Sequence, residues 1–165
     1  MKETLLTVLE NTRLADGIYR LRLAGDTSAI TAPGQFVNLK LSGFFLRRPI
    51  SVCDWENGEV TLIYKVLGHG TEAMTGMAVG TALDVLTGLG NGFDLSRSGE
   101  HPLLVGGGVG IPPLYGLAKR LTAQGKRVTA VLGFNRKSEI FLAEEFRALG
   151  AEVVIATADG SVGLK

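Results

Sequence analysis

The chain has 165 residues, of which 45% are apolar and 20% charged, a composition that supports a folded core and excludes a disordered chain. Its 17 basic and 16 acidic side chains nearly balance, so nothing indicates a nucleic-acid partner or a membrane surface. The single cysteine, Cys53, excludes an internal disulfide, and with two distant histidines it makes no metal site. No apolar run approaches the roughly 20 residues of a membrane span and no signal peptide is evident, so we expect a cytoplasmic protein.

Residues 1–97 alternate apolar and polar side chains in the manner of half-buried strands. The clearest stretches are residues 18–23, 36–41 and 59–66. Several short strands separated by turn signals predict a small antiparallel β-barrel, interrupted by one short helix around residues 71–77. Asp84 and Asp94, which flank a glycine-rich stretch, are expected to form turns.

Residues 98–165 follow a polar linker and have a different periodicity. Strand-like runs at 102–105, 127–133 and 152–156 alternate with helical spacing at 112–123 and 138–149. This order predicts a parallel sheet with helical crossovers. A nucleotide-binding sheet usually has five or six strands, so we expect an incomplete α/β domain and a truncated chain.

The sequence Arg47-Arg48-Pro49-Ile50-Ser51 is the first candidate site. An arginine can grip a diphosphate with its planar fork of donors, and a helix that starts near Gly70-Thr71 would offer backbone N–H groups. Two solvated arginines on an edge strand are the alternative explanation. Together the two segments predict a diphosphate clamp.

The strand that leads into this helix ends in Ile63-Tyr64-Lys65. Its backbone amides can read the edge of a flat heterocycle, although the Tyr64 side chain fits a core position equally well. Cys53 lies just after the arginine motif, where a buried thiol is favoured over a redox-active one.

The second candidate site is Gly106-Gly107-Gly108-Val109-Gly110, between a strand and a helix that starts with proline. Backbone N–H groups at such a junction bind nucleotide phosphates. The run departs from the G-x-G-x-x-G fingerprint, because Ile111 occupies the position of the third glycine. Turn glycines without a ligand are the alternative explanation.

These motifs resemble the ferredoxin-reductase superfamily, and within it the electron-transfer subunits of bacterial NAD-dependent dihydroorotate dehydrogenases. The resemblance rests on Leu46 to Val52 and on Gly106 to Leu114, and it extends from the N-terminus to the last residue. It implies a flavin-binding barrel followed by a nucleotide-binding α/β domain. In many superfamily members an aromatic residue that stacks on the flavin occupies the position of Ile50.

The resemblance implies FAD bound by three segments and NAD bound by the glycine run. The residues implied for FAD are Arg48, Pro49, Ile50, Ser51, Ile63, Tyr64, Lys65, Gly70 and Thr71, and those for NAD are Gly106, Gly107, Gly108 and Gly110. No side chain is expected to act as a catalytic acid, base or nucleophile. The family also holds a [2Fe-2S] cluster on four cysteines, which are absent from these residues.

The implied function is electron transfer in pyrimidine biosynthesis, from an FMN-containing dihydroorotate dehydrogenase catalytic subunit through the cluster and FAD to NAD, within a heterotetramer. An isolated fragment is expected to be inactive in that reaction. Two other functions remain open. One is a flavin reductase or the flavoprotein subunit of a ferredoxin-linked NAD(P) oxidoreductase, and the other is a β-barrel scaffold that binds no cofactor. The choice between NAD and NADP is also open, because Arg136 can attract a 2′-phosphate or face water.

Overall fold

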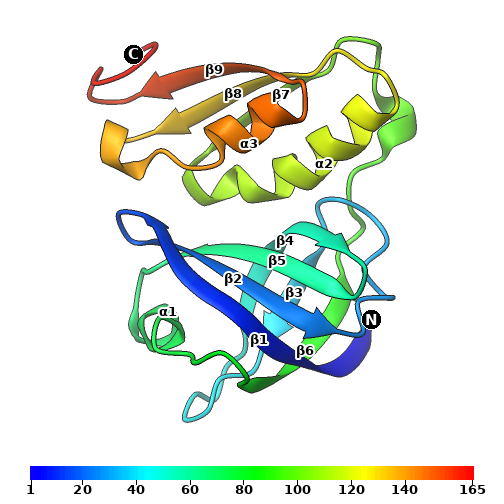
Figure 1. The fold of residues 1–165 in the computed structure, drawn as a ribbon, viewed down its shortest axis with the longest axis vertical. Coiled ribbons are helices and arrows are strands. Elements are labelled where there is room, and N and C mark those ends of the chain that lie inside the picture. Colours follow the sequence, from blue (N-terminus) through cyan, green and yellow to red (C-terminus); the bar gives the residue numbers. More distant parts are fainter.

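A computed structural model describes residues 1–165 and contains two halves stacked one above the other (Figure 1). The lower half is a closed antiparallel barrel of six strands, as the alternating pattern predicted. Its strands run in the spatial order β1-β2-β5-β4-β3-β6. Their bounds are β1 Lys2–Ala15, β2 Ile18–Gly25, β3 Phe36–Leu39, β4 Arg48–Glu56, β5 Glu59–Lys65 and β6 Ala82–Leu89.

The inward positions of these strands form a core of 15 buried side chains. Leu21 and Leu23 on β2 and Val60 and Leu62 on β5 are fully buried, while the residues between them face outward or pack between the halves. Because side chains alternate along a strand, every second residue reaches the barrel interior. The single helix of this half, α1 (His69–Met74), follows β5.

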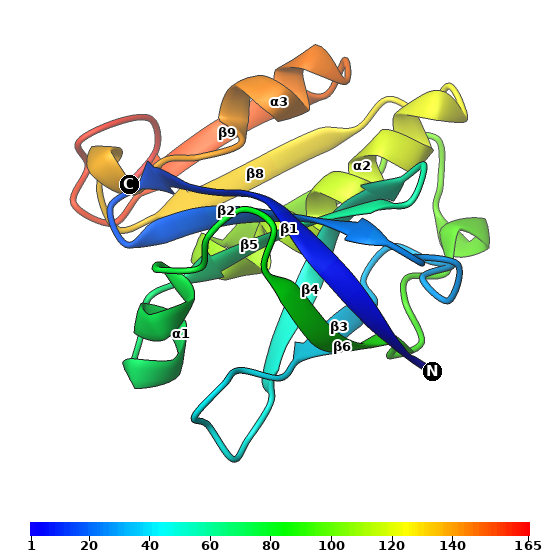
Figure 2. The ribbon, with the colours of Figure 1, turned by 60° about the horizontal axis from the view of Figure 1, so that its bottom comes forward.

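The upper half is a parallel sheet of three strands in the order β7-β8-β9. Its elements are β7 Leu103–Gly107, α2 Pro112–Ala123, β8 Thr129–Phe134, α3 Ala143–Ala148 and β9 Glu152–Thr157. Both crossovers proceed in the same direction across the sheet, so right-handed connections place both helices on one face. Figures 1 and 2 show α2 between the sheet and the barrel.

Two sequence predictions were wrong in detail. The helix expected over residues 138–149 is a 3₁₀ turn (Lys137–Glu139) followed by α3, because Leu142 adopts a left-handed backbone with φ of 62°. This break allows Phe141 and Leu142 to bury their side chains in the α/β core. Asp84 does not form a turn but lies within β6. Asp94 does cap the 3₁₀ turn Leu95–Arg97.

The two halves meet where α2 packs on the outer surface of β4. The α/β core has 18 buried residues, and three of them, Ile18, Cys53 and Ile63, come from the outside of the barrel. A Cβ atom at Gly116 would lie 2.7 Å from the Cys53 carbonyl oxygen, closer than real Cβ contacts allow. A glycine at position 116 is therefore required for this close approach. Cys53 is 2% exposed, and burial raises the pKa of its thiol, so the structure supports the buried thiol rather than a reactive one.

Polar contacts flank the same interface. Lys119 on α2 forms ion pairs with Asp54 at 2.7 Å and Glu56 at 3.0 Å. Arg120 lies over the Trp55 ring at 3.5 Å from its centroid. The opposite face of the parallel sheet carries no helix, and on it Leu103 and Val105 are 63% and 66% exposed. No helix of the chain is long and apolar enough to span a membrane.

Candidate functional site

The two neighbouring arginines have different surroundings. Arg47 is neutralised by Asp84, which accepts at 2.9 and 3.0 Å, and it also reaches Glu3. Arg48 forms no ion pair with a carboxylate. Its guanidinium donates to the backbone carbonyl of Leu46 and lies 5.0 Å from the centre of the Phe44 ring. Arg48 is therefore the arginine whose charge remains available to an anionic ligand.

Arg48 and Gly70 lie against one another, as the diphosphate clamp requires. A Cβ atom at Gly70 would lie 2.1 Å from Arg48 Nε, so a side chain at position 70 would displace the guanidinium from this place. The two residues share an open groove of about 720 Å³. Its lining is Phe44, Arg48, Leu67, Gly68, His69, Gly70 and Thr71. The Thr71 hydroxyl accepts hydrogen bonds from the backbone N–H groups of Leu67 and Gly68, which fixes this loop.

Strands β4 and β5 separate where the remaining candidates lie. The two strands pair from Glu56 with Glu59 up to Val52 with Leu62. Beyond that point β4 pairs with β3 instead, so residues 48–51 and 63–65 occupy two diverging strand ends. Backbone groups on strand edges need partners from water, side chains or a ligand. A flat polar ring can be read by the backbone at such an opening.

The side chains of the second segment point in three different directions. Ile63 packs into the α/β core and Tyr64 into the barrel core, where it is 1% exposed. Burial raises the pKa of Tyr64 to about 12, and its hydroxyl donates to Asn11 at 3.1 Å. Only Lys65 reaches a cavity with its side chain. The structure thus supports the core alternative for the Tyr64 side chain. Ile63 and Tyr64 can contact a ligand only through their backbone groups.

The structure gives different reasons for the presence of each glycine in the second candidate site. At Gly106 a Cβ atom would lie 2.7 Å from the Leu114 side chain, so this glycine permits the close packing of α2 on β7. Gly108 has a φ of 50°, in the left-handed region. Gly107 and Gly110 would meet nothing closer than an ordinary contact. Packing does not require glycine there, and the missing side chains leave room at the carboxyl end of β7.

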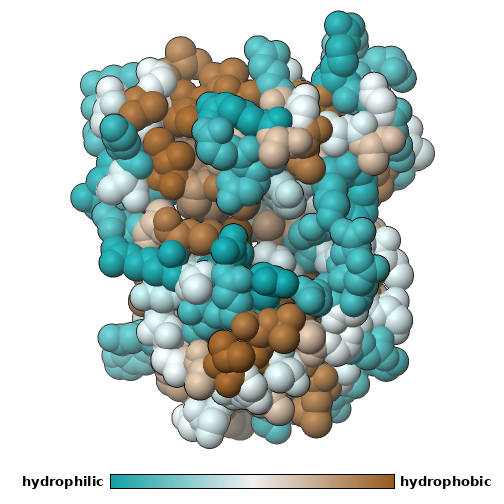
Figure 3. Space-filling model, viewed as in Figure 1, coloured by the Kyte–Doolittle hydropathy of each residue, from teal (hydrophilic) through white to brown (hydrophobic).

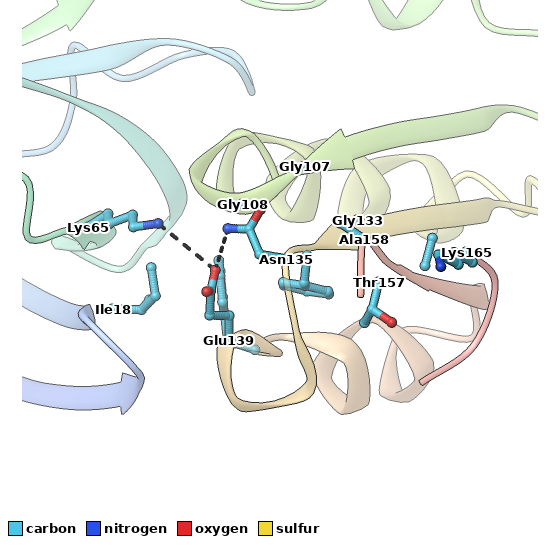
Figure 4. Close-up of a pocket in the computed structure, with 13 residues that line it drawn as sticks. Ile18, Lys65, Gly107, Gly108, Gly133, Asn135, Glu139, Thr157, Ala158 and Lys165 are labelled. Carbon is cyan, nitrogen blue, oxygen red and sulfur yellow. Dashed lines mark hydrogen bonds and ion pairs between the residues drawn. The ribbon is translucent and has the colours of Figure 1, made fainter. Parts of the chain in front are cut away.

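A cleft of about 470 Å³ lies between the barrel and the carboxyl ends of the parallel strands (Figure 4). We call it the interdomain cleft. It is lined by Ile18, Lys65, Gly107, Gly108, Gly133, Phe134, Asn135, Glu139, Phe141, Ala156, Thr157, Ala158 and Lys165. Figure 3 shows hydrophobic residues in the recess between the two halves. Open α/β sheets bind ligands at the carboxyl ends of their strands, so the position matches a nucleotide site.

Sequence reasoning missed four polar residues of this cleft, namely Asn135, Glu139, Thr157 and Lys165. Asn135 and Thr157 lie at the carboxyl ends of β8 and β9, and that placement was the available signal. Glu139 follows in the 3₁₀ turn, and its side chain is 12% exposed. Hydrogen bonds from Arg136 and Asn135 lower the pKa of Glu139, so it is ionised near neutral pH.

Solved structures share this arrangement of barrel and sheet. The NADH-dependent reduced ferredoxin-NADP oxidoreductase superposes with a TM-score of 0.87 at 31% identity, over 98% of this chain and 59% of that one. Phthalate dioxygenase reductase gives a TM-score of 0.81 at 21% identity, over 96% of this chain and 52% of that one, which shows likeness of fold. The protein therefore has the fold of the ferredoxin-reductase-like electron-transfer proteins, as the sequence motifs predicted.

Curated relatives define the family more closely, although no protein-family model matches the chain. The dihydroorotate dehydrogenase B (NAD(+)) electron transfer subunit of Bacillus pumilus is 46% identical over all of this chain and 67% of its own length. The subunit of Enterococcus faecalis is 44% identical over 98% of this chain and 64% of its own length. The chain belongs to this family of electron transfer subunits, and it spans about two thirds of the length of these relatives.

Proposed function

We propose that the chain is the FAD- and NAD-binding part of an electron transfer subunit that serves a dihydroorotate dehydrogenase catalytic subunit. The observation that carries the proposal is the Arg48 guanidinium, which has no carboxylate partner and lies against Gly70 in an open groove. In this proposal residues 1–97 form the flavin domain and residues 98–165 the nucleotide domain.

FAD fits the first site by the chemistry of its donors. Arg48 would hold the diphosphate together with the backbone near Gly70 and Thr71, and Phe44 would flank it. The diverging ends of β4 and β5 would present Pro49, Ile50 and Ser51 on one side and Ile63, Tyr64 and Lys65 on the other. When bound, a flavin supplies reversible transfer of electrons and of hydride.

NAD fits the interdomain cleft. The side-chain-free surface at Gly107, Gly108 and Gly133 permits close approach of a ligand to the backbone, and Gly106 and Gly110 shape the loop around it. Lys65 reaches the same cleft from the barrel, so the two proposed ligand sites adjoin there. The protein's contribution is to fix the orientation of two rings and to exclude water between them. No side chain is proposed to act as a catalytic acid, base or nucleophile.

The partner proposed from the family is an FMN-containing catalytic subunit, assembled with this subunit as a heterotetramer in the cytoplasm. These residues contain one cysteine and therefore no set of four that could hold a [2Fe-2S] cluster. A second function is favoured by the 31% identity to the ferredoxin-NADP oxidoreductase, namely service as the flavoprotein part of a ferredoxin-linked complex. Co-purification with a dihydroorotate-oxidising protein rather than with a ferredoxin-linked one would separate the two.

The FAD site is tested by titrating the purified protein with FAD and following the quenching of flavin fluorescence. A charged hydrogen-bonding partner contributes about 1.5–3 kcal/mol, so Arg48→Ala should weaken FAD binding by about tenfold to a hundredfold without loss of fold. Arg47→Ala is the matched control, because Arg47 is already paired with Asp84. Equal FAD affinity of Arg48→Ala and the unaltered protein, or no FAD binding at all, would contradict the proposal.

A further inference from the structure

One ion pair spans the interdomain cleft and joins the two halves. Lys65 Nζ, at the end of β5, lies 3.9 Å from Glu139 Oε2, which belongs to the α/β half (Figure 4). The backbone N–H of Asp16 also donates to the Ser138 carbonyl oxygen at 3.3 Å, so this edge of the interface is held at two neighbouring points. The pair therefore lies where the proposed flavin and nucleotide sites adjoin.

The carboxylate is the fixed member of this pair. Asn135 donates to Glu139 at 2.8 Å and Arg136 at 3.0 Å, and both donors lie directly before the 3₁₀ turn that carries Glu139. The Glu139 side chain is 12% exposed, against 33% for Lys65. Because two local donors already hold the carboxylate, Lys65 meets a preorganised acceptor and not a flexible one.

The ammonium group is the adjustable member. A separation of 3.9 Å exceeds hydrogen-bonding range, so the attraction is electrostatic and allows Lys65 some freedom within the cleft. Charges in a partly buried site are screened less than those on the open surface. The carboxylate therefore offsets part of the positive charge that Lys65 brings to the cleft.

We propose that Glu139 is a positioning residue that holds Lys65 at the interdomain cleft and sets how much of its positive charge a bound flavin experiences. This inference rests on the proposed function, since it needs FAD beside Lys65. Reduction adds negative charge to a flavin, which an unopposed ammonium group stabilises. Removing the carboxylate should make reduction easier, and removing the ammonium group should make it harder.

The test measures the two-electron midpoint potential of bound FAD by equilibration with a reference dye. Glu139→Gln should shift the potential to more positive values and Lys65→Met to more negative values. In the Lys65→Met background, the shift in potential caused by Glu139→Gln should be clearly smaller, because the ammonium group through which Glu139 acts is absent. Arg136→Gln is the matched control, since it removes a local partner of Glu139 and leaves both members of the cross-cleft pair.

The outcomes separate the two proposals. An equal shift from Glu139→Gln in both backgrounds, or no shift, overturns the role of Glu139 acting through Lys65 while FAD binding stands. A shift of the same size in Arg136→Gln also overturns it, because the effect would then come from the loop and not from the pair. If the unaltered protein takes up no FAD, the proposed function fails first and this inference with it.

Discussion

The barrel and the parallel sheet differ in how completely each pairs its own strands and buries its own apolar side chains. The barrel closes, so all six strands have two neighbours and a core of their own. The parallel sheet does not close, and its β9 edge pairs with Leu164 through a single bridge. One of its faces carries no helix, and its core includes Ile18, Cys53 and Ile63 from the barrel surface. Closed sheets remove exposed edges, whereas open ones depend on what covers them. The α/β half should therefore depend on the barrel more than the barrel depends on it.

The largest effect expected from this difference follows from a cavity in the α/β core. Phe146 is fully buried there, and Phe146→Ala should lower the free energy of unfolding of that half by about 3–5 kcal/mol. The barrel should keep its protected amides in hydrogen exchange. Leu62→Ala in the barrel core, at about 2–5 kcal/mol, should instead reduce protection in both halves. Equal loss of protection in both halves from Phe146→Ala would contradict the asymmetry.

A smaller effect is expected at the contact between the halves. Replacing a helical glycine by alanine normally stabilises a protein by about 0.5–1 kcal/mol. Gly116→Ala should reverse that sign and destabilise by about 1–3 kcal/mol, because its Cβ would collide with the Cys53 carbonyl oxygen. Trp55, the only tryptophan, should report the separation from Arg120 by a red shift of its fluorescence.

Gly99→Ala is the control for Gly116→Ala, since a Cβ atom there meets nothing within 4 Å and its φ is not positive. It should leave both the stability of the α/β half and the tryptophan emission nearly unchanged. A Gly116→Ala variant that is more stable than the unaltered protein would show that the interface can relax at no cost.

The smallest effect concerns pH. The pKa of Glu139 is lowered below its ordinary value of 4.5 in the folded state by hydrogen bonds from Arg136 and Asn135. A lowered folded-state pKa contributes stability above the unfolded value, and that contribution is lost as the pH falls through the folded-state pKa. At pH 7 the free energy of unfolding of the unaltered protein should exceed that of Glu139→Gln by less than about 1 kcal/mol. Thermal unfolding below pH 4.5 should show the difference closing, and a difference that widens in acid would contradict the assignment.

The sequence predicted elements whose periodicity is local. Helix α2 has the predicted bounds of 112–123, because its apolar spacing and its starting prolines all lie within the helix. Helix α3 was predicted too long, because the left-handed break at Leu142 follows from the burial of Phe141 and Leu142 against distant elements. Local spacing carries no information about that burial.

The same limit applies to the candidate site. The arginine motif identified the position, but not which arginine is free, since that depends on the strand pairing that brings Asp84 beside Arg47. Glu139 was missed because its partner Lys65 lies in the other half of the chain. The assignment of FAD and NAD to individual residues is a prediction, and the FAD titration of Arg48→Ala tests its first part.

Because Cys53 is buried in the contact beneath Gly116, the labelling rate of its thiol reports how often the two halves separate. The residue is 2% exposed, and because the pKa of its thiol is raised, it carries almost no thiolate at neutral pH while the halves are in contact. A thiol-specific reagent in excess can modify it only during excursions in which α2 lifts from β4, so the labelling rate counts those excursions. A nucleotide that bridges the interdomain cleft would lower this labelling rate. One unaltered side chain would then measure interdomain opening in the absence of any engineered probe.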